Sequence, residues 1–198
     1  MDEKTLETTN ALAVDYFKNY SEHTFMEKFR TKFIELISGK KILDVGCGIG
    51  RDMREFNKKG FRTFGIDVSS EMLKIARQEN PKGFLYNMDM SNMTFTDGEF
   101  DGVWCCSSLY HVHKREVPAI FKKFYDFLKK DGLLFLTVKK GEGEGYMPRD
   151  LFYGREKFYA LYSPEELIDL LNAAGFAFVS CEIEIKDQIW INVFARKE

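Results

Sequence analysis

The residues with the clearest chemical signature are three glycines at alternate positions, Gly46, Gly48 and Gly50, in the run ILDVGCGIG. Residues 42–45 before them have the pattern of a buried strand, and a helix is expected to begin at Arg51. Glycine lets the backbone turn sharply and approach a ligand closely, and the free amides at a helix start favour negative or polar groups. The pattern indicates a backbone cradle for a polar ligand, although a simple turn without a ligand has similar glycines.

An aspartate follows each of the next two predicted strands. Asp67 stands about 20 residues beyond the glycines, where an acid accepts hydrogen bonds from the hydroxyls of a ribose. Asp89 lies between Met88 and Met90, so a carboxylate that suits an adenine amino group is flanked by thioethers that suit a ring face. Alternatively, Asp67 caps the helix that begins near Ser69, and Asp89 is an ordinary loop residue. Because the carboxyl ends of parallel strands meet at one edge, the three features together predict a nucleoside site.

Strands and helices alternate from Lys40 onward, and this alternation is what positions the three features. Strands are expected at 42–45, 61–66, 83–87, 100–106 and 133–138. The intervening helices are expected at 51–59, from Ser69 onward, and over 117–128. This order predicts a doubly wound α/β sheet, in which ligands bind at the carboxyl ends of the strands.

The two ends of the chain have different patterns. Apolar residues recur at helical spacing before the alternation begins, and many of them are aromatic. After it, Ser163-Pro164-Glu165-Glu166 is a helix-capping sequence, and strands at 176–185 and 188–195 are close enough to pair as an antiparallel hairpin. We expect one domain, 1–198, divided into N-terminal helices (1–38), a cofactor-binding core (40–138), an acceptor-side loop (139–162), and a helix with an antiparallel hairpin (163–198).

Composition excludes several classes of protein. The chain has 198 residues and a net charge of −2, which gives no general attraction to nucleic acid or anionic lipid. Its four cysteines form no Cys-x-x-Cys pair, so we expect reduced thiols, a cytoplasmic location and no metal site. No signal peptide is evident, and no apolar run approaches the roughly 18 residues that span a bilayer.

Five segments together resemble the class I S-adenosylmethionine-dependent methyltransferases: ILDVGCGIGRD, FGIDVSSEML, MDM, FDGVWCCSSLYHV and FLKKDGLLFLTVKKGEGEG. More narrowly, the chain resembles small methyltransferase-domain proteins related to the ubiquinone/menaquinone-biosynthesis type, over about residues 40 to 198. The resemblance implies a Rossmann-like seven-stranded sheet with the order 3-2-1-4-5-7-6. Its last strand would be antiparallel, and an N-terminal helical lid would cover the cofactor.

The resemblance also implies roles for individual residues. The three glycines would form the cofactor loop, and Asp44 would orient it or reach the methionyl moiety through water. Asp67 would hold the ribose, and Asp89 with Met90 the adenine. Other contacts to S-adenosyl-L-methionine are expected from the lid, the loop and the strand ends, namely Tyr16, Tyr20, Cys47, Arg51, Val68, Met72, Cys106 and Ser107. The two tyrosines could instead be an aromatic stripe that packs on the core.

Methyl transfer is an in-line displacement on an already activated donor, so the protein mainly positions and desolvates the reactants. Some acceptors need a base, and His111, five residues beyond the fourth strand, is the candidate. The alternative is a histidine with a purely structural role. Arg149, Arg155, Tyr159 and Trp190 could also line an acceptor pocket, but an exposed charged loop is the favoured interpretation for the two arginines, and core burial for Trp190.

The leading hypothesis is therefore methyl transfer to a small molecule by a monomer or homodimer. RNA or protein methylation, with the acceptor presented by a partner subunit, is the alternative within the same chemistry. The sequence lacks the Asn/Asp-Pro-Pro-Tyr signature of many base and amide methylases, and nucleic acid is not an expected partner. A non-catalytic S-adenosylmethionine sensor remains open, whereas the glycine spacing disfavours a nicotinamide oxidoreductase.

Overall fold

A seven-stranded sheet forms the centre of the computed structural model, which describes residues 1–148, 154–186 and 188–198. The strand order is β3-β2-β1-β4-β5-β9-β8. The first five strands are parallel, and β9 pairs antiparallel with both β5 and β8. Because β8 and β9 are the sixth and seventh strands of this sheet, the order confirms the predicted Rossmann-like topology. The strands are β1 (Lys41–Val45), β2 (Arg62–Asp67), β3 (Phe84–Asn87), β4 (Phe100–Cys106), β5 (Leu128–Lys139), β8 (Phe176–Ile185) and β9 (Ile189–Lys197).

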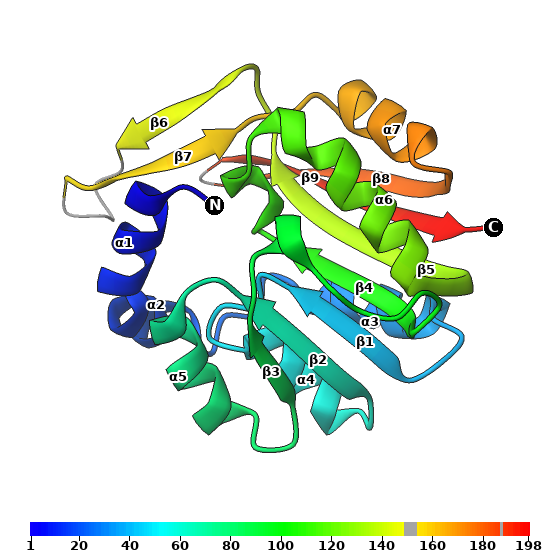
Figure 1. Cartoon of the computed structure of the whole chain (residues 1–198), viewed down its shortest axis with the longest axis horizontal. Helices are drawn as coiled ribbons and strands as arrows, with labels where there is room; N and C mark the ends of the chain where they lie inside the picture. Colours follow the sequence, from blue (N-terminus) through cyan, green and yellow to red (C-terminus); the bar gives the residue numbers. More distant parts are fainter. Residues whose placement is uncertain (149–153, 187) are drawn as a thin grey trace.

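Helices cover both faces of the sheet (Figure 1). On one face, α3 (Glu27–Leu36) and α4 (Arg51–Lys58) pack on an aromatic cluster that includes Trp104 and Phe135. On the other, α6 (Val117–Phe127) and α7 (Pro164–Ala173) pack on the larger aliphatic core. Successive strand residues point to opposite faces, so β1 contributes Ile42 to the first cluster and Leu43 to the second. The strands are consequently buried on both sides, as their apolar sequences predict.

The predicted helix starts are present where side chains satisfy the free amides. Ser69 caps α5 (Ser70–Glu79) by accepting a hydrogen bond from Met72 N, and Ser163 caps α7 in the same way. One boundary differs from its prediction. Helix α6 ends at Phe127 and β5 begins at Leu128, before the Asp131-Gly132 pair that was expected to separate them.

The N-terminal region contains a helix that the apolar pattern did not indicate. It folds as α1 (Glu3–Ala11), α2 (Ala13–Tyr20) and α3. The buried side chains of α1 are threonines, and they bond to the hairpin described next: Thr5 Oγ1 accepts from Phe158 N at 2.9 Å, and Thr8 Oγ1 donates to Glu156 O at 3.1 Å. Polar contacts rather than an apolar stripe hold α1, which explains why periodicity missed it.

The segment 139–162, expected to be a loop, contains an antiparallel hairpin. Strand β6 (Glu144–Pro148) pairs with β7 (Glu156–Ala160). In β7, the residues from Lys157 to Ala160 are buried. In Figure 1, the hairpin and α1 stand at the edge of the sheet toward which the arrows of β1 and β4 point. They therefore cover the carboxyl ends of the strands. No described helix has the length and apolar character of a membrane span.

Candidate cofactor site

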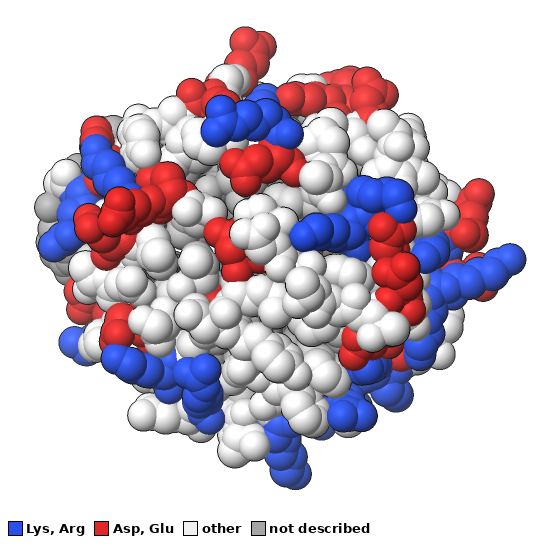
Figure 2. All heavy atoms as spheres, in the orientation of Figure 1, with Lys and Arg blue, Asp and Glu red and all other residues white. Residues whose placement is uncertain are grey.

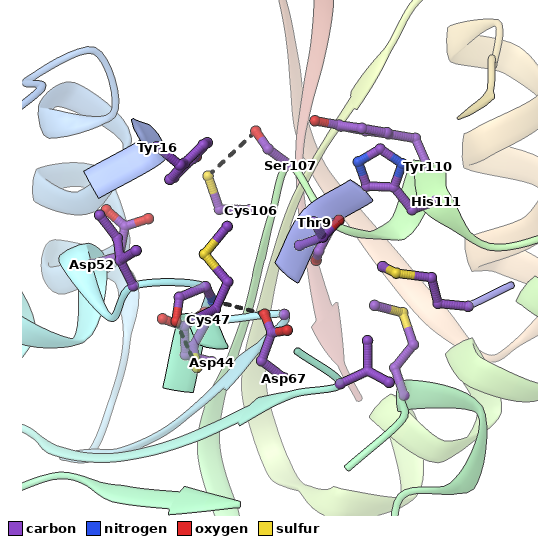
Figure 3. Close-up of a pocket in the computed structure, with 18 of the residues that line it drawn as sticks. Thr9, Tyr16, Asp44, Cys47, Asp52, Asp67, Cys106, Ser107, Tyr110 and His111 are labelled. Carbon is purple, nitrogen blue, oxygen red and sulfur yellow. Dashed lines mark hydrogen bonds between the residues drawn. The ribbon is translucent and has the colours of Figure 1, made fainter. Parts of the chain in front are cut away.

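A cavity of about 590 Å³ opens at the carboxyl ends of the parallel strands (Figure 3). The structure brings together on its walls every residue predicted to contact the cofactor except Gly50, together with His111. These lining residues are Tyr16, Tyr20, Asp44, Gly46, Cys47, Gly48, Arg51, Asp67, Val68, Met72, Asp89, Met90, Cys106, Ser107 and His111. They come from segments spread over nearly a hundred positions of the chain, so the fold, not local sequence, assembles the site.

The glycine loop wraps around the end of β2. Gly46 N and Cys47 N both donate to Ile66 O, at 2.8 and 2.9 Å, and Gly48 N donates to Asp67 Oδ2 at 2.8 Å. Gly46 and Gly48 have φ values of 72° and 54°, in the left-handed region that favours glycine. Gly50 lies away from the cavity, where it precedes α4 with a φ of 76° and its carbonyl accepts from Asn80 Nδ2.

Alanine substitutions should separate the two roles of this loop. A Cβ at Gly46 would stand 2.3 Å from Ser108 Cβ, whereas one at Gly48 would meet nothing within 4 Å and would occupy the space left for a ligand. We expect Gly46→Ala to lower the free energy of unfolding by about 2 kcal/mol. Gly48→Ala should cost only about 1 kcal/mol of stability but weaken S-adenosylhomocysteine binding roughly tenfold. Urea unfolding measures the stability of each variant, and calorimetric titration measures its affinity. If both variants lost the same affinity and neither lost stability, the two glycines would not have these separate roles.

Two acids lie beside the loop. Asp67 accepts hydrogen bonds from Gly48 N and from Ser69 N, each at 2.8 Å, and its carboxylate lines the cavity. Asp44 is 2% exposed and lines the same cavity, but its carboxylate accepts no hydrogen bond from the residues that the structure describes. Burial, with the Asp52 charge nearby, raises the pKa of Asp44 well above its usual value, and burial also raises that of Asp67. Both carboxylates are thus poorly solvated acceptors that a bound hydroxyl or amino group would stabilise.

Asp89 has partners of its own. Its carboxylate accepts from Ser91 N at 2.9 Å and pairs with the Met1 ammonium at 2.7 Å. Burial raises the pKa of Asp89, but these hydrogen bonds outweigh it and leave the pKa below its usual value. The Met72 and Met90 thioethers and Val68 line the cavity as well, and they provide apolar surface for a ring.

A buried charge network lies at the other end of the loop. Asp52 accepts from Arg30 Nη1 at 2.5 Å and from Trp104 Nε1 at 3.1 Å, and pairs with Arg51 Nη2 at 3.3 Å. Although burial raises the pKa of Asp52, the two guanidinium groups lower it below its usual value. Two cations therefore share one anion, and Arg51 Nη1 is buried without a hydrogen-bond partner in the described structure. Because Arg51 lines the cavity, this donor fits a ligand carboxylate.

The predicted lid tyrosines come from α2. Their rings lie 4.7 Å apart between centroids, and both line the cavity. Burial raises the pKa of Tyr16 to about 12, so its hydroxyl stays protonated and available as a donor. Thr9 of α1 extends this cover, as Figure 3 shows. Thr9 was not among the predicted site residues, because no apolar pattern indicates α1.

The far wall carries His111, on the short 3-10 helix η2 (Leu109–His111). A carbonyl only accepts, so His111 Nδ1 donates to Phe158 O at 2.7 Å and leaves Nε2 unprotonated. Burial and the charges of Lys157 and Lys139 lower the pKa of His111 to about 3. The imidazole is therefore neutral near pH 7 and too weak a base to hold a proton by itself.

Other acceptor-side predictions had mixed outcomes. Tyr159 and Trp190 line the cavity, although core burial was the favoured interpretation for Trp190. Arg155 is exposed and does not line it, as the charged-loop interpretation predicts, and Arg149 lies outside the described residues. Lys157 also lines the cavity, but it was not predicted because it lies on β7, a strand that the sequence does not indicate. In the described ranges, no group of three or more His, Cys, Asp or Glu side chains is placed to hold a metal.

The histidine makes the acid stability of the fold testable. An unfolded histidine binds a proton below a pKa of about 6.5, whereas folded His111 does so only near 3, so stability falls as the pH drops between these values. His111→Asn keeps a donor near Nδ1 for Phe158 O but cannot be protonated. Between pH 7 and pH 5, urea unfolding should show wild type losing roughly 1–2 kcal/mol more than the variant. Parallel pH profiles would show that His111 is not the buried neutral group described.

Comparisons with known proteins agree with this geometry. Residues 42–132 match the family model described as a methyltransferase domain. The Bacillus subtilis protein YqeM, whose name describes it as a methyltransferase, is 40% identical over 116 residues, or 54% of this chain and 47% of its own. Phosphoethanolamine N-methyltransferase of Plasmodium falciparum is 30% identical over 148 residues, which cover 72% of this chain and 56% of the relative. The chain spans about half the length of these curated relatives.

Solved structures share the fold. A Burkholderia thailandensis 1,6-didemethyltoxoflavin-N1-methyltransferase, solved with S-adenosylhomocysteine, superposes with a TM-score of 0.78 at 19% identity over 98% of this chain and 87% of its own. A Methanosarcina mazei S-adenosylmethionine-dependent methyltransferase superposes with a TM-score of 0.77 at 20% identity, over 84% of this chain and 96% of its own. Strand order, glycine loop and family match agree, and the chain belongs to the class I S-adenosylmethionine-dependent methyltransferase superfamily.

Proposed function

We propose that this chain is an enzyme that transfers the methyl group of S-adenosylmethionine to a small molecule. The observation that carries the proposal is the convergence, in one cavity, of the Gly46–Gly48 backbone, the Asp67 carboxylate and the unpartnered donor of Arg51. These groups match the ribose and the methionyl carboxylate of that cofactor. When bound, the cofactor supplies an activated methyl group on a sulfonium, so the chain has to bind, orient and exclude water.

Each wall of the cavity has a role in the proposal. Asp67 accepts the ribose hydroxyls, and Asp89 with Met90 holds the adenine. Arg51, helped by the Tyr16 and Tyr20 hydroxyls, binds the carboxylate, and Asp52 keeps the guanidinium in position. These assignments leave the strand end at Cys106 and Ser107 beside the sulfur. Two more lining side chains, Asp44 and Cys47, would also contact the cofactor.

His111 lines the cavity across from Asp44 (Figure 3), and we assign it to the acceptor side. We assign it the role of orienting the acceptor through Nε2. Its pKa near 3 argues against a role as a strong base, because such an imidazole takes up a proton only weakly. An acceptor that is already nucleophilic, or deprotonated before binding, is consistent with this site.

Two observations favour a small-molecule acceptor. The relatives that cover most of this chain include phosphoethanolamine N-methyltransferases, whose named substrate is small. On the face in Figure 2, basic and acidic side chains are interspersed around an uncharged centre, so its described residues present no broad basic surface for RNA. RNA or protein methylation is the alternative that a substrate screen would detect.

Thermal unfolding with candidate ligands tests the proposal. At a concentration a hundred times its Kd, S-adenosylhomocysteine should stabilise the chain by about 2.7 kcal/mol, which raises Tm by roughly 5–10 °C. NADH at the same concentration should leave Tm unchanged. Stabilisation by NADH but not by S-adenosylhomocysteine would refute the proposed function.

A further inference from the structure

Helix α1 contacts both halves of the cavity. Toward the cofactor side, Thr9 lines the cavity, and Asn10 Oδ1 accepts a hydrogen bond from Ser69 Oγ at 2.6 Å. Ser69 N in turn donates to Asp67 Oδ1, the proposed ribose acceptor, at 2.8 Å. Toward the acceptor side, α1 is bonded to β7, and Figure 1 shows the helix between α5 and the β6–β7 hairpin. One helix therefore touches the elements that hold Asp67 and those that hold the acceptor side.

The edge of β7 that faces away from β6 is bonded to α1 and to His111. The backbone of Phe158 makes both links: its N–H donates to Thr5 Oγ1 at 2.9 Å, and its carbonyl accepts from His111 Nδ1 at 2.7 Å. Two positions earlier, the Glu156 carbonyl accepts from Thr8 Oγ1 at 3.1 Å. Alternate residues of a strand present their backbone groups to the same edge, so these three bonds lie along one line. A single residue of β7 thus joins α1 to the histidine.

The bond between Thr5 and Phe158 fixes the position of this part of β7. Thr5 is 0% exposed and Phe158 is 3% exposed, so water cannot replace the hydroxyl as a partner for the buried amide. His111 donates to the carbonyl of the same residue. The position of that carbonyl therefore sets the orientation of the imidazole and determines that Nδ1 carries the proton.

The other contacts between α1 and the hairpin lie nearer to solvent. Tyr146 of β6 donates its hydroxyl to Asp2 Oδ1 at 2.8 Å, and Lys4 pairs with Glu156. Tyr146 is 46% exposed, and exposed ion pairs contribute little to stability. The buried Thr5 and Thr8 bonds consequently define how α1 sits on β7. Because the contact is polar, it opens with little loss of apolar burial, and a ligand that holds α1 would keep it closed.

We infer that Thr5 is a positioning residue for His111, and that α1 couples the acceptor side of the cavity to the cofactor side. The inference rests on the proposed function, since it concerns the histidine that is assigned to the acceptor. A cofactor bound against Thr9 holds α1 in place. Through Thr5, the helix holds the backbone of Phe158, and this backbone holds the imidazole. The acceptor then meets an oriented histidine once the cofactor is bound.

Nitrogen-15 NMR of the His111 ring tests the positioning role, because it reports which ring nitrogen carries the proton. At pH 7 the wild type should show the proton on Nδ1. Thr5→Val removes the hydroxyl and should leave His111 as a mixture of both tautomers, whereas Thr5→Ser should restore the Nδ1–H form. The matched control Thr63→Val removes another fully buried hydroxyl, which donates to Asn57 Oδ1 at 2.9 Å. It should lower stability without changing the tautomer.

Amide hydrogen exchange of the full chain tests the coupling. Exchange of the Phe158 N–H requires the contact between α1 and β7 to open, and a ligand that binds only the closed form suppresses that opening. Saturating S-adenosylhomocysteine should therefore slow exchange at Phe158 by about tenfold or more. The control is the amide of Gly98, which donates to Asp126 O and does not line the cavity. Its exchange should change by less than about twofold.

Three results would overturn the inference. They are a wild-type tautomer in Thr5→Val, a tautomer change in Thr63→Val as large as that in Thr5→Val, and exchange at Phe158 that S-adenosylhomocysteine does not slow. If Thr5→Val fails to fold, the exchange measurement on the wild type still decides. Failure of S-adenosylhomocysteine itself to bind would refute the proposed function, whereas normal binding without slower exchange at Phe158 would refute only this inference.

Discussion

Replacing Asp67 with alanine is expected to weaken S-adenosylhomocysteine binding by roughly a hundredfold. The carboxylate is proposed to accept two ribose hydroxyls, and hydrogen bonds to a charged group contribute about 1.5–3 kcal/mol each. A loss of about 3 kcal/mol corresponds to a factor of roughly one hundred in Kd. Calorimetric titration measures this factor directly.

The Asp67 carboxylate also accepts hydrogen bonds from Gly48 N and Ser69 N. A control must therefore distinguish the loss of a ligand contact from a change in the structure of the loop. Asp101 provides this control, because its carboxylate likewise accepts hydrogen bonds from two backbone amides, Lys40 N and Lys41 N, and does not line the cavity. Asp101→Ala should lower stability while Kd stays within about twofold. An Asp67→Ala variant that binds S-adenosylhomocysteine normally would remove Asp67 from the ribose site.

Replacing Arg51 with methionine is expected to remove the ability of the protein to recognise the carboxylate of its ligand. The buried guanidinium lines the cavity, and one of its nitrogens has no hydrogen-bond partner in the described structure. Wild type should bind S-adenosylhomocysteine more tightly than 5′-methylthioadenosine, which lacks the amino acid end. Arg51→Met should weaken the former by about 2–3 kcal/mol, between thirtyfold and a hundredfold, and leave the latter nearly unchanged.

Arg54 supplies the matched control for this comparison. It lies on the same helix, pairs with Glu79 at 2.9 Å and does not line the main cavity. Arg54→Met should leave both affinities as they are. If Arg51→Met weakens the binding of both ligands equally, Arg51 stabilises the loop and does not bind the ligand carboxylate.

The sheet and the cofactor side of the cavity were predictable because their signals are local. Buried parallel strands are continuous apolar runs, Ser69 and Ser163 cap helices through their own sequence, and Gly46 and Gly48 need positive φ. Parallel topology then brings the residues that follow β1, β2 and β3 to one edge. The sequence alone therefore places Asp67 and Asp89 at one site.

The acceptor side was not predictable, because contacts distant in sequence define it. Helix α1 is held by Thr5 and Thr8 through polar bonds to β7, which leave no apolar period. In the sequence, Lys157 is indistinguishable from an ordinary exposed lysine, and only the hairpin shows that it is buried. The pairing of Asp52 with Arg30 and Trp104 joins α4 to α3 and β4, and nothing in the spacing of these residues indicates it.

A crystal structure of the chain with S-adenosylhomocysteine tests the central claim most directly. The account predicts the nucleoside in the cavity, with both ribose hydroxyls within hydrogen-bond distance of Asp67, the adenine amino group at Asp89 and the carboxylate at Arg51. A ligand bound outside this cavity, or one whose ribose lies away from Asp67, would contradict it.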